Sequence, residues 1–377
     1  MTGREKIEAA LSTEGSPLVP VVIPYIGIYV RDRWADLTSC PWWFMHDPDV
    51  DHQLAWIREA QSALDVDWVE VYTWYSADER AALSVELTGD RPELVDARTG
   101  SRRPLHRPTI GGWPSGGVAS HRPESPPTTI EELDACVPTA APGLVESLAH
   151  DGRADLARAV TSGLPDLYPL AFCGAPLWNC YFIWGFEGLM ETIALRPDLV
   201  EHAVELCLRR NLALARDAAL LGARGIWVEE CMTDAIGPAA FERLNVPAAK
   251  RLIDEIRALG LRSIYYWCGD PAGKLDMILS CGADAVSLEE SKKGFTADIG
   301  EVADRAAGRC AVFGNLDSIG ILEDGTDDQL QAGIQRQLRV AGRLGGRFVM
   351  SLGSPVTPGT PPERVRRYCE LSRNLRR

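Results

Sequence analysis

Reactive side chains stand at the ends of two apolar runs in the second half of the sequence. The first run leads into Cys268 and Asp270, and the second leads into Glu289 and Glu290. Between them, residues 274–280 carry apolar side chains at helical spacing. This order predicts a strand, a helix and a strand. It places a thiol and several carboxylates at the carboxyl ends of parallel strands, where such folds bind their ligands.

Polar side chains follow the neighbouring predicted strands in the same way. They are Glu229, Glu230 and Cys231, then Tyr266 ahead of Cys268, then Asn315 and Asp317, and finally Ser351 and Ser354. A buried carboxyl group can act as a general acid or base because burial raises its pKa. The catalytic candidates are Cys268, Tyr266, Glu229, Glu230 and Asp270, and the expected substrate-binding residues include Asn315, Asp317 and Ser354. The alternative is that each is a buried polar group serving the fold, and Asp317 and Ser354 also suit helix N-caps.

Three roles are open to Cys268: nucleophile, metal ligand, or packing thiol. The first two require a lowered pKa. A catalytic zinc site uses about three protein ligands, and no histidine lies beyond His202, so a site here would combine Cys268 with a glutamate. Adjacent strand residues point to opposite faces, so at most one of Glu229 and Glu230, and at most one of Glu289 and Glu290, should face the ligand unless the strand has already ended.

A few basic and aromatic side chains are expected at the same place. Arg31, Arg33 and Lys292 could orient a substrate carboxylate through charge-assisted hydrogen bonds, although Lys292 is also close enough in sequence to pair with the preceding glutamates. Trp178 and other tryptophans could line a pocket for a flat or apolar substrate, or belong to the core.

Eight segments are predicted as strands, and from the fourth onward they alternate with single helices. They span about 18–26, 67–74, 167–173, 225–230, 262–268, 284–289, 310–316 and 347–353. Eight such units predict an α/β protein with a closed (β/α)₈ barrel, a TIM barrel. No GxGxxG motif follows the first strand to favour a doubly wound sheet. Residues 83–129 interrupt the alternation and are interpreted as an inserted β-hairpin or two and a long loop, within one domain covering 1–377.

Composition restricts the partners. The 377 residues are 46% hydrophobic and 24% charged, as in globular proteins with a large core. A net charge of −14 disfavours nucleic acid and anionic membranes, and no apolar run approaches the ~20 residues of a membrane span. The N-terminus does not have the pattern of a signal peptide, and the ten cysteines form no CxxC pair. We expect a cytoplasmic protein with reduced thiols.

Several short motifs in this sequence occur together in one known protein family. They are Tyr266-Trp267-Cys268-Gly269-Asp270, GADAVSLEE, Gly314-Asn315-Leu316-Asp317, Gly345-Gly346, Ser351-Leu352-Gly353-Ser354 and Thr360-Pro361-Pro362-Glu363. Together they resemble the uroporphyrinogen decarboxylase superfamily, which includes the decarboxylases, the corrinoid- and coenzyme M-dependent methyltransferases and related thiol alkyltransferases. The match covers most of 220–372 and, loosely, the first 30 residues. The resemblance implies a (β/α)₈ barrel and a homodimer.

The resemblance is closer to the methyltransferase and alkyltransferase branch, because the decarboxylase signature PxWxMRQAGR is replaced by Tyr29-Val30-Arg31-Asp32-Arg33. The zinc-dependent methyltransferases use a His-x-Cys motif and a later cysteine, where this chain has Tyr266, Cys268 and Ser354. Glu290 follows Cys268 by 22 residues, a position where a related zinc enzyme has a glutamate ligand. The resemblance therefore implies, at most, a rebuilt zinc site of Cys268 and Glu290, and a corrinoid protein as the partner that donates the methyl group.

Three functions are open. The leading hypothesis is transfer of a methyl or other alkyl group of a small acidic or thiol-containing metabolite. The first alternative is a metal-free decarboxylase or lyase acting on a small carboxylic acid, in which Tyr266 and a carboxyl group protonate the product. The second alternative is a non-catalytic barrel that binds a ligand or a corrinoid.

Overall fold

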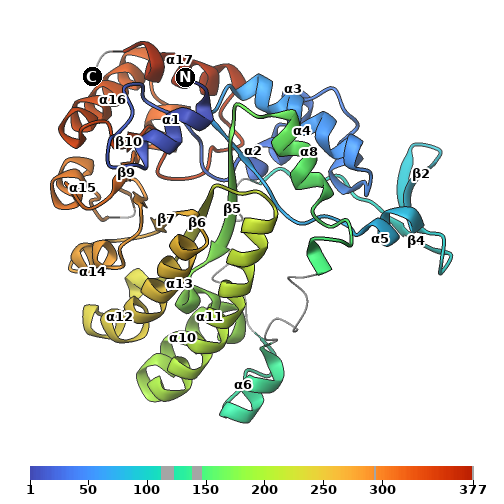
Figure 1. The fold of residues 1–377 in the computed structure, drawn as a ribbon, viewed down its shortest axis with the longest axis horizontal. Helices are drawn as coiled ribbons and strands as arrows, with labels where there is room; N and C mark the ends of the chain where they lie inside the picture. The colour runs from blue at the N-terminus through green and yellow to red at the C-terminus, as the bar shows by residue number, and fades with distance from the viewer. Residues whose placement is uncertain (112–122, 138–146, 293, 376–377) are drawn as a thin grey trace.

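The computed structural model describes residues 1–111, 123–137, 147–292 and 294–375. Its centre is a parallel sheet of seven strands in the order β1-β5-β6-β7-β8-β9-β10, surrounded by helices (Figure 1). The strands are β1 (Trp68–Glu70), β5 (Tyr168–Gly174), β6 (Gly225–Glu230), β7 (Arg262–Trp267), β8 (Ala285–Leu288), β9 (Ala311–Phe313) and β10 (Phe348–Val349). The predicted α/β barrel architecture is confirmed, and seven of the eight predicted strands appear as named strands of the sheet.

The predicted first strand, 18–26, is reduced to a single bridge that joins the two edges of the sheet. Val21 pairs in parallel with Met350, the residue after β10. On the other side, the N–H of Asp67, just before β1, donates to the carbonyl of Val21 at 2.9 Å. Val21 therefore takes the place of an eighth strand between β10 and β1, and its contacts close the barrel.

Proline explains why this segment does not form a longer strand. Pro20 and Pro24 have no N–H group to donate to a neighbouring strand. Tyr25 then adopts a left-handed conformation with φ of 54°, and helix α2 (Ile26–Asp32) begins inside the predicted strand.

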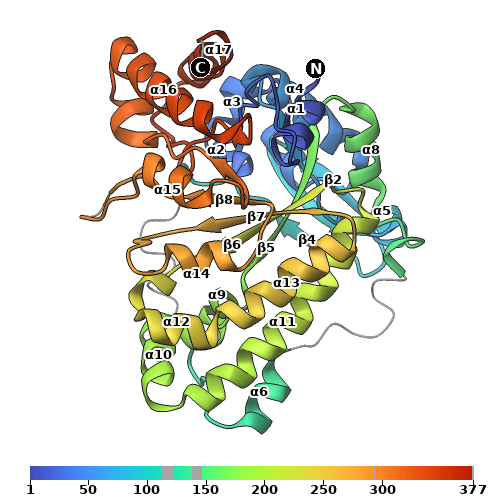
Figure 2. The same cartoon turned by 60° about the vertical axis from the view of Figure 1, so that its left-hand side comes forward.

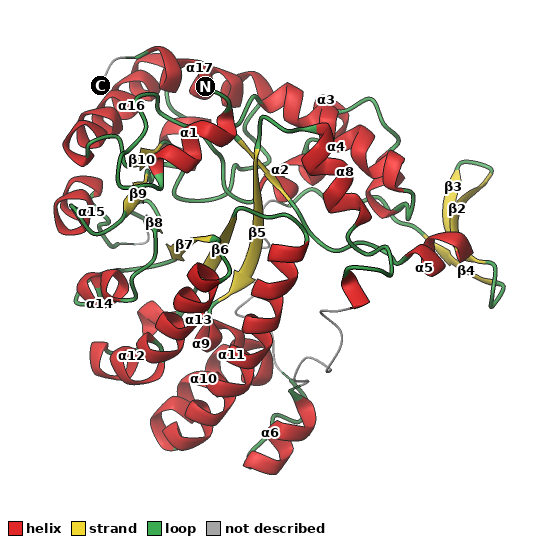
Figure 3. Cartoon of the chain, in the orientation of Figure 1, coloured by secondary structure: helices red, strands yellow, loops and turns green. Residues whose placement is uncertain are grey.

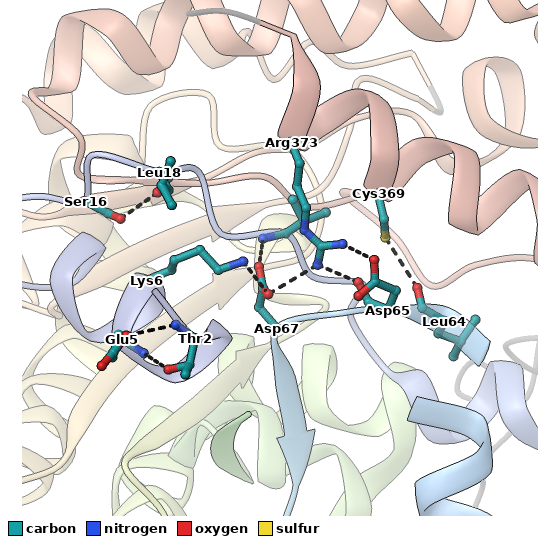
Figure 4. A network of polar contacts seen from close by, with 11 residues as sticks. Thr2, Glu5, Lys6, Ser16, Leu18, Leu64, Asp65, Asp67, Cys369 and Arg373 are labelled. Atoms are coloured by element: carbon teal, nitrogen blue, oxygen red, sulfur yellow. Dashed lines mark hydrogen bonds and ion pairs between the residues drawn. The ribbon is translucent and has the colours of Figure 1, made fainter. Parts of the chain in front are cut away.

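A charged network reinforces the closure and joins both ends of the chain (Figure 4). The buried Asp67 accepts hydrogen bonds from Val21 N at 2.7 Å and from Lys6 Nζ at 2.6 Å. Arg373 donates to the same carboxylate at 3.2 Å and also pairs with Asp65. Figure 4 shows Lys6 reaching Asp67 from α1 (Gly3–Ala10) and Arg373 reaching it from α17 (Pro362–Asn374). The buried carboxylate is therefore compensated by two cations and an amide.

Helices cover the outside of the barrel (Figures 2 and 3). The longer ones are α4 (Val50–Leu64), α8 (Asp155–Gly163), α10 (Tyr181–Leu195), α11 (Pro197–Leu220), α13 (Val246–Ala258), α15 (Ile299–Ala306) and α16 (Asp327–Ala341). The shorter ones are α3 (Trp34–Leu37), α5 (Ala77–Ala82), α6 (Ile130–Cys136), α9 (Pro176–Asn179), α12 (Pro238–Leu244), α14 (Leu275–Ser280), η1 (Trp42–His46), η2 (Thr233–Ala235), η3 (Ser318–Glu323) and η4 (Gly342–Leu344). Residues 238–258 form two helices, α12 and α13, because Pro247 lies in the first turn of the second one. No helix among the described ranges is long and apolar enough to cross a bilayer.

The insertion forms a small separate sheet. Strands β2 (Leu83–Thr88), β3 (Arg91–Asp96) and β4 (Ser101–Pro104) pair antiparallel, which makes two hairpins that share β3. In Figure 1 this sheet extends from the right-hand edge of the molecule, away from the barrel. It confirms the predicted hairpins, whereas residues 112–122 of the predicted long loop lie outside the described residues.

Aromatic rings fill the barrel interior. The fully buried Trp227 of β6 stacks on Tyr266 of β7, with ring centroids 5.0 Å apart. Its indole meets Trp68 of β1 edge-on at 5.6 Å and Phe313 of β9 at 6.0 Å. These ring contacts pack the interior of the barrel between β1, β6, β7 and β9.

Candidate active site

Glu229, at the end of β6, is the centre of a first group of polar side chains at the barrel mouth. Its Oε1 accepts hydrogen bonds from Tyr25 OH at 2.8 Å and from Cys231 Sγ at 3.4 Å, and the side chain of Trp178 also donates to the carboxylate. Burial raises the pKa of Glu229, and these three hydrogen bonds offset only part of the effect. This carboxyl group, flanked by a hydroxyl and a thiol, is suited to proton transfer.

Cys268 lies beside this group, immediately after β7. It is partly exposed and hydrogen-bonds to Cys231. The hydrogen bond to Cys268, together with burial, raises the pKa of Cys231 well above its usual value. Cys231 therefore keeps its proton near neutral pH.

Tyr266 contacts both the group around Glu229 and the loop after β10. Its ring packs edge-on against Tyr25 at 5.9 Å, and its hydroxyl donates to the carbonyl of Gly353 at 2.9 Å. Burial raises the pKa of Tyr266 well above its usual value, and the nearby Cys268 adds to this effect. The hydroxyl is therefore a proton-bearing group that is already engaged with the backbone.

Lys292 organises a second group of side chains. Its Nζ lies 2.6 Å from Glu289 Oε1 and 3.5 Å from Glu290 Oε1, and it also hydrogen-bonds to Ser354. Ser354 donates in turn to Glu290 Oε2 at 2.7 Å. Burial alone would lower the pKa of Lys292, but Glu290 and Glu289 outweigh it and raise the pKa, so the side chain is an ammonium ion. The electrostatic effect of Cys268 on Lys292 links this group to the first.

Glu289 offers an open acceptor in this second group. The residue is 4% exposed, and its Oε2 is buried without a hydrogen-bond partner in the described part of the chain. An unsatisfied buried oxygen of this kind is costly unless a ligand donates to it. Glu290 differs, because its oxygens contact Ser354, Ser318 and Lys292.

Cys268 and Glu290, the two residues expected to hold zinc, are not joined, in the portion of the chain that the structure describes, by the further ligands that a zinc site needs, and the residues at the positions of the family's other two ligands are engaged elsewhere. The hydroxyl of Tyr266 is bonded to a backbone carbonyl, and the hydroxyl of Ser354 lies between Glu290 and Lys292. In the described ranges, no three side chains of His, Cys, Asp or Glu are gathered closely enough to coordinate a metal ion. The ammonium group of Lys292 instead supplies positive charge at this edge of the barrel.

Glu230 lies on the opposite face of β6 from Glu229, as the alternation predicted. It is 0% exposed and accepts a hydrogen bond from Tyr265 OH at 3.0 Å, and Tyr265 accepts one from Asn245 Nδ2 at 2.8 Å. Burial raises the pKa of Glu230 to about 8. The hydrogen bond of Glu230 is thus to Tyr265, and through it to Asn245 at the start of α13, and not to the side chains around Glu229.

Five other predicted residues make contacts that shape loops. Asp270 accepts a hydrogen bond from Ala272 N, and Asn315 donates to the carbonyls of Glu289 and Ala297. Asp317 caps η3. Arg31 forms an ion pair with Asp32, and Arg33 forms one with Asp36. The structure therefore brings together Glu229, Trp178, Cys268 and Tyr266 on one side, and Lys292, Glu290 and Ser354 on the other.

Glu70 is a candidate that the sequence reasoning missed. Burial raises its pKa to about 7, and a hydrogen bond from the N–H of Gly27 offsets part of the effect. With Tyr72 and Phe172 it lines a cavity of about 470 Å³ beside β1 and β5. The signal was present in the sequence, because Trp68, Glu70 and Tyr72 are alternate residues of one strand and share its inner face.

The chain is similar to a known protein family. Residues 123–375, more than half of the chain, match the profile of the family described as Uroporphyrinogen decarboxylase (URO-D). The chain belongs to the uroporphyrinogen decarboxylase family. The predicted resemblance is confirmed, and the family's relatives include both decarboxylases and methyltransferases.

Two curated relatives illustrate this range. Uroporphyrinogen decarboxylase 2, chloroplastic, of Arabidopsis thaliana is 26% identical over 215 residues, which are 55% of this chain and 52% of that protein. Methylcobamide:CoM methyltransferase of Methanosarcina mazei is 23% identical over 181 residues, 48% of this chain and 50% of that protein. The chain thus spans about half the length of the curated relatives that it matches.

A solved structure extends the likeness to the whole fold. A methyltransferase from Methanosarcina mazei superposes with a TM-score of 0.69 at 17% identity and covers 99% of this chain and 98% of that one. At this identity the superposition shows the fold of a uroporphyrinogen decarboxylase-like barrel.

Proposed function

We propose that this member of the uroporphyrinogen decarboxylase family transfers a methyl or other alkyl group of a small thiol-containing or acidic metabolite. The observation that carries the proposal is the position of Cys268. It is partly exposed at the barrel mouth, it is hydrogen-bonded to Cys231, and it interacts electrostatically with the Lys292 ammonium ion. A nearby cation stabilises the negative charge that a sulfur nucleophile carries.

The residues at the mouth have complementary tasks in such a transfer. The sulfur attacks the alkyl carbon while the bond from that carbon to the donor breaks, and the donor leaves with the bonding electrons. The thiol of the substrate supplies this sulfur, and Cys268 contacts it. Glu229 in its ionised form takes up the thiol proton, Tyr25 holds the carboxylate in place by its hydrogen bond, and Glu289 Oε2 accepts a hydrogen bond from the substrate.

The relative named methylcobamide:CoM methyltransferase supports a corrinoid protein as the partner that supplies the methyl group. The residues at the mouth do not favour zinc as an aid to the reaction, since Tyr266 and Ser354 are engaged with protein groups. We therefore assign sulfur activation to Lys292 and Glu229.

The test uses the full chain purified without added metal, methylcobalamin as donor, and a panel of small thiols and carboxylic acids. Loss of the cobalt–methyl absorbance and a methylated product should be seen with the wild type, and Cys268→Ala should lower the rate by at least about 100-fold. Cys281→Ala is the matched control, because Cys281 is buried behind α14. Full activity in Cys268→Ala, or one bound zinc per chain that this variant loses, would contradict the proposed mechanism.

A second candidate function, a metal-free decarboxylase, is favoured by one specific observation. Burial raises the pKa of Glu229, which favours its protonated form, and its carboxyl group lies beside the hydroxyl of Tyr25. Such a proton could reach the carbanion that is left when carbon dioxide departs. The same samples, treated with chelator and assayed for carbon dioxide release from the carboxylic acids, distinguish the two. Release without any alkyl transfer would replace the first function by the second, and stoichiometric binding without turnover would replace both by a binding role.

A further inference from the structure

The cavity beside β1 and β5 has acidic groups and, among the lining residues that the structure describes, no basic ones. The two strands pair over only three residues, and α11 forms the outer wall of the space. The lining contains two carboxylates, three aromatic rings, and otherwise apolar side chains, one glycine and one threonine. The carboxylates are those of Glu70 and Asp217, and the rings are those of Tyr25, Tyr72 and Phe172. None of these described lining residues carries a positive charge.

Both carboxylates lack a counter-charge inside the cavity. Glu70 is held by the N–H of Gly27. Asp217 has a buried Oδ1 with no hydrogen-bond partner among the described residues. Arg153 interacts electrostatically with Asp217 but lies outside the lining and hydrogen-bonds to Asp151 at 2.7 Å. Burial raises the pKa of both carboxyl groups, in agreement with this shortage of positive charge.

The walls around these carboxylates suit a particular kind of cation. Aromatic faces attract positive charge, and the effect is strongest for cations that are weakly hydrated. A metal ion would need several oxygen ligands in a compact shell, whereas most of this wall is apolar. The volume of about 470 Å³ is that of a small-molecule site.

We propose that this cavity binds an organic ammonium ion, a small amine that carries alkyl groups on its nitrogen. Glu70 and Asp217 supply the negative charge, and Tyr25, Tyr72 and Phe172 enclose the alkyl groups. Tyr25 also donates to Glu229, so the ligand lies next to the first group of side chains at the mouth. The proposal does not depend on alkyl transfer, because binding is measured without turnover.

Isothermal titration of the full chain tests this proposal directly. The ligands are choline and its uncharged isostere, in which carbon replaces the nitrogen. Choline should bind at one site per chain, and the isostere at least about 10-fold more weakly. Glu70→Gln and Asp217→Asn should each weaken choline binding by a similar factor. Glu242→Gln, which removes an exposed carboxylate on α12, should leave it unchanged.

A further variant keeps the test valid if the two carboxylate variants fold poorly. Leu214 is 39% exposed at the cavity rim, so Leu214→Lys should fold normally and place an ammonium group over the cavity. It should abolish choline binding, while Leu214→Met should retain it. No binding of choline, equal affinity for the isostere, or full binding by Leu214→Lys would each overturn the proposal.

Discussion

Replacing Glu230 by glutamine should stabilise the protein at neutral and alkaline pH. Glu230 is fully buried, and burial raises its pKa to about 8 from an ordinary 4.5. The folded protein therefore binds this proton more tightly than the unfolded chain does. Glutamine has the same shape, its amide oxygen can accept the Tyr265 hydroxyl proton, and it carries no charge at any pH.

The size of the effect follows from the two pKa values. Between pH 4.5 and pH 8 the unfolded chain releases the proton while the folded protein retains it, so the free energy of unfolding falls as the pH rises. Each pH unit costs at most ~1.4 kcal/mol. Above pH 8 the cost of burying Glu230 thus reaches at most ~5 kcal/mol, and near pH 7 it is ~3 kcal/mol.

Urea unfolding at a series of pH values, followed by tryptophan fluorescence, measures this directly. Glu230→Gln should match the wild type near pH 4.5 and exceed it by a margin that grows until about pH 8. Glu242→Gln, at an exposed position, provides the control with a margin near zero. Parallel stability curves for Glu230→Gln and the wild type would refute the reasoning, since they would mean that Glu230 is ionised in the folded state.

Two other substitutions test the loops at the barrel mouth. Lys292→Met should lower the free energy of unfolding by about 3 kcal/mol, because Glu289 and Glu290 lose the ammonium ion that balances them. Adding Glu289→Gln should restore part of this loss, and an unchanged urea midpoint for Lys292→Met would contradict the assigned pairing. Gly269→Ala should cost more than about 1 kcal/mol, since Gly269 has φ of +108° and an added Cβ would lie 2.4 Å from the Asp234 side chain. Gly260→Ala, at φ of +76° with open space around it, should cost less in the same urea titration.

The sequence was most informative where local pattern decides the structure. β6 was predicted at its observed bounds and β7 within one residue of them, because β-branched and aromatic residues lie at 226–228 in β6 and at 264–267 in β7. The first predicted strand failed because two prolines remove the donors that a ladder needs. Alternation along β6 also correctly separated Glu229 from Glu230.

The parts of the site that depend on distant contacts could not be read from the sequence. Ser354 was assigned to substrate binding or a helix cap, but its partner Glu290 is 64 residues away. That contact exists only because the loops after β8 and β10 meet at the same rim. Lys292 was close in sequence to both glutamates, so its ion pairs were foreseeable, whereas its bond to Ser354 was not. Glu70 could have been found by applying the same alternation rule to β1.

The closing of the ring has a consequence for the order in which the protein can be built on the ribosome. The bridge to Val21 needs Met350, and the Asp67 network needs Arg373, which is 306 residues further along the chain. Until Met350 and Arg373 have been synthesised, the N-terminal edge of the sheet has no partner on one side, and the growing chain exposes an unpaired sheet edge. Docking of α17, once it has left the ribosome, is therefore the step that completes the closure of the barrel.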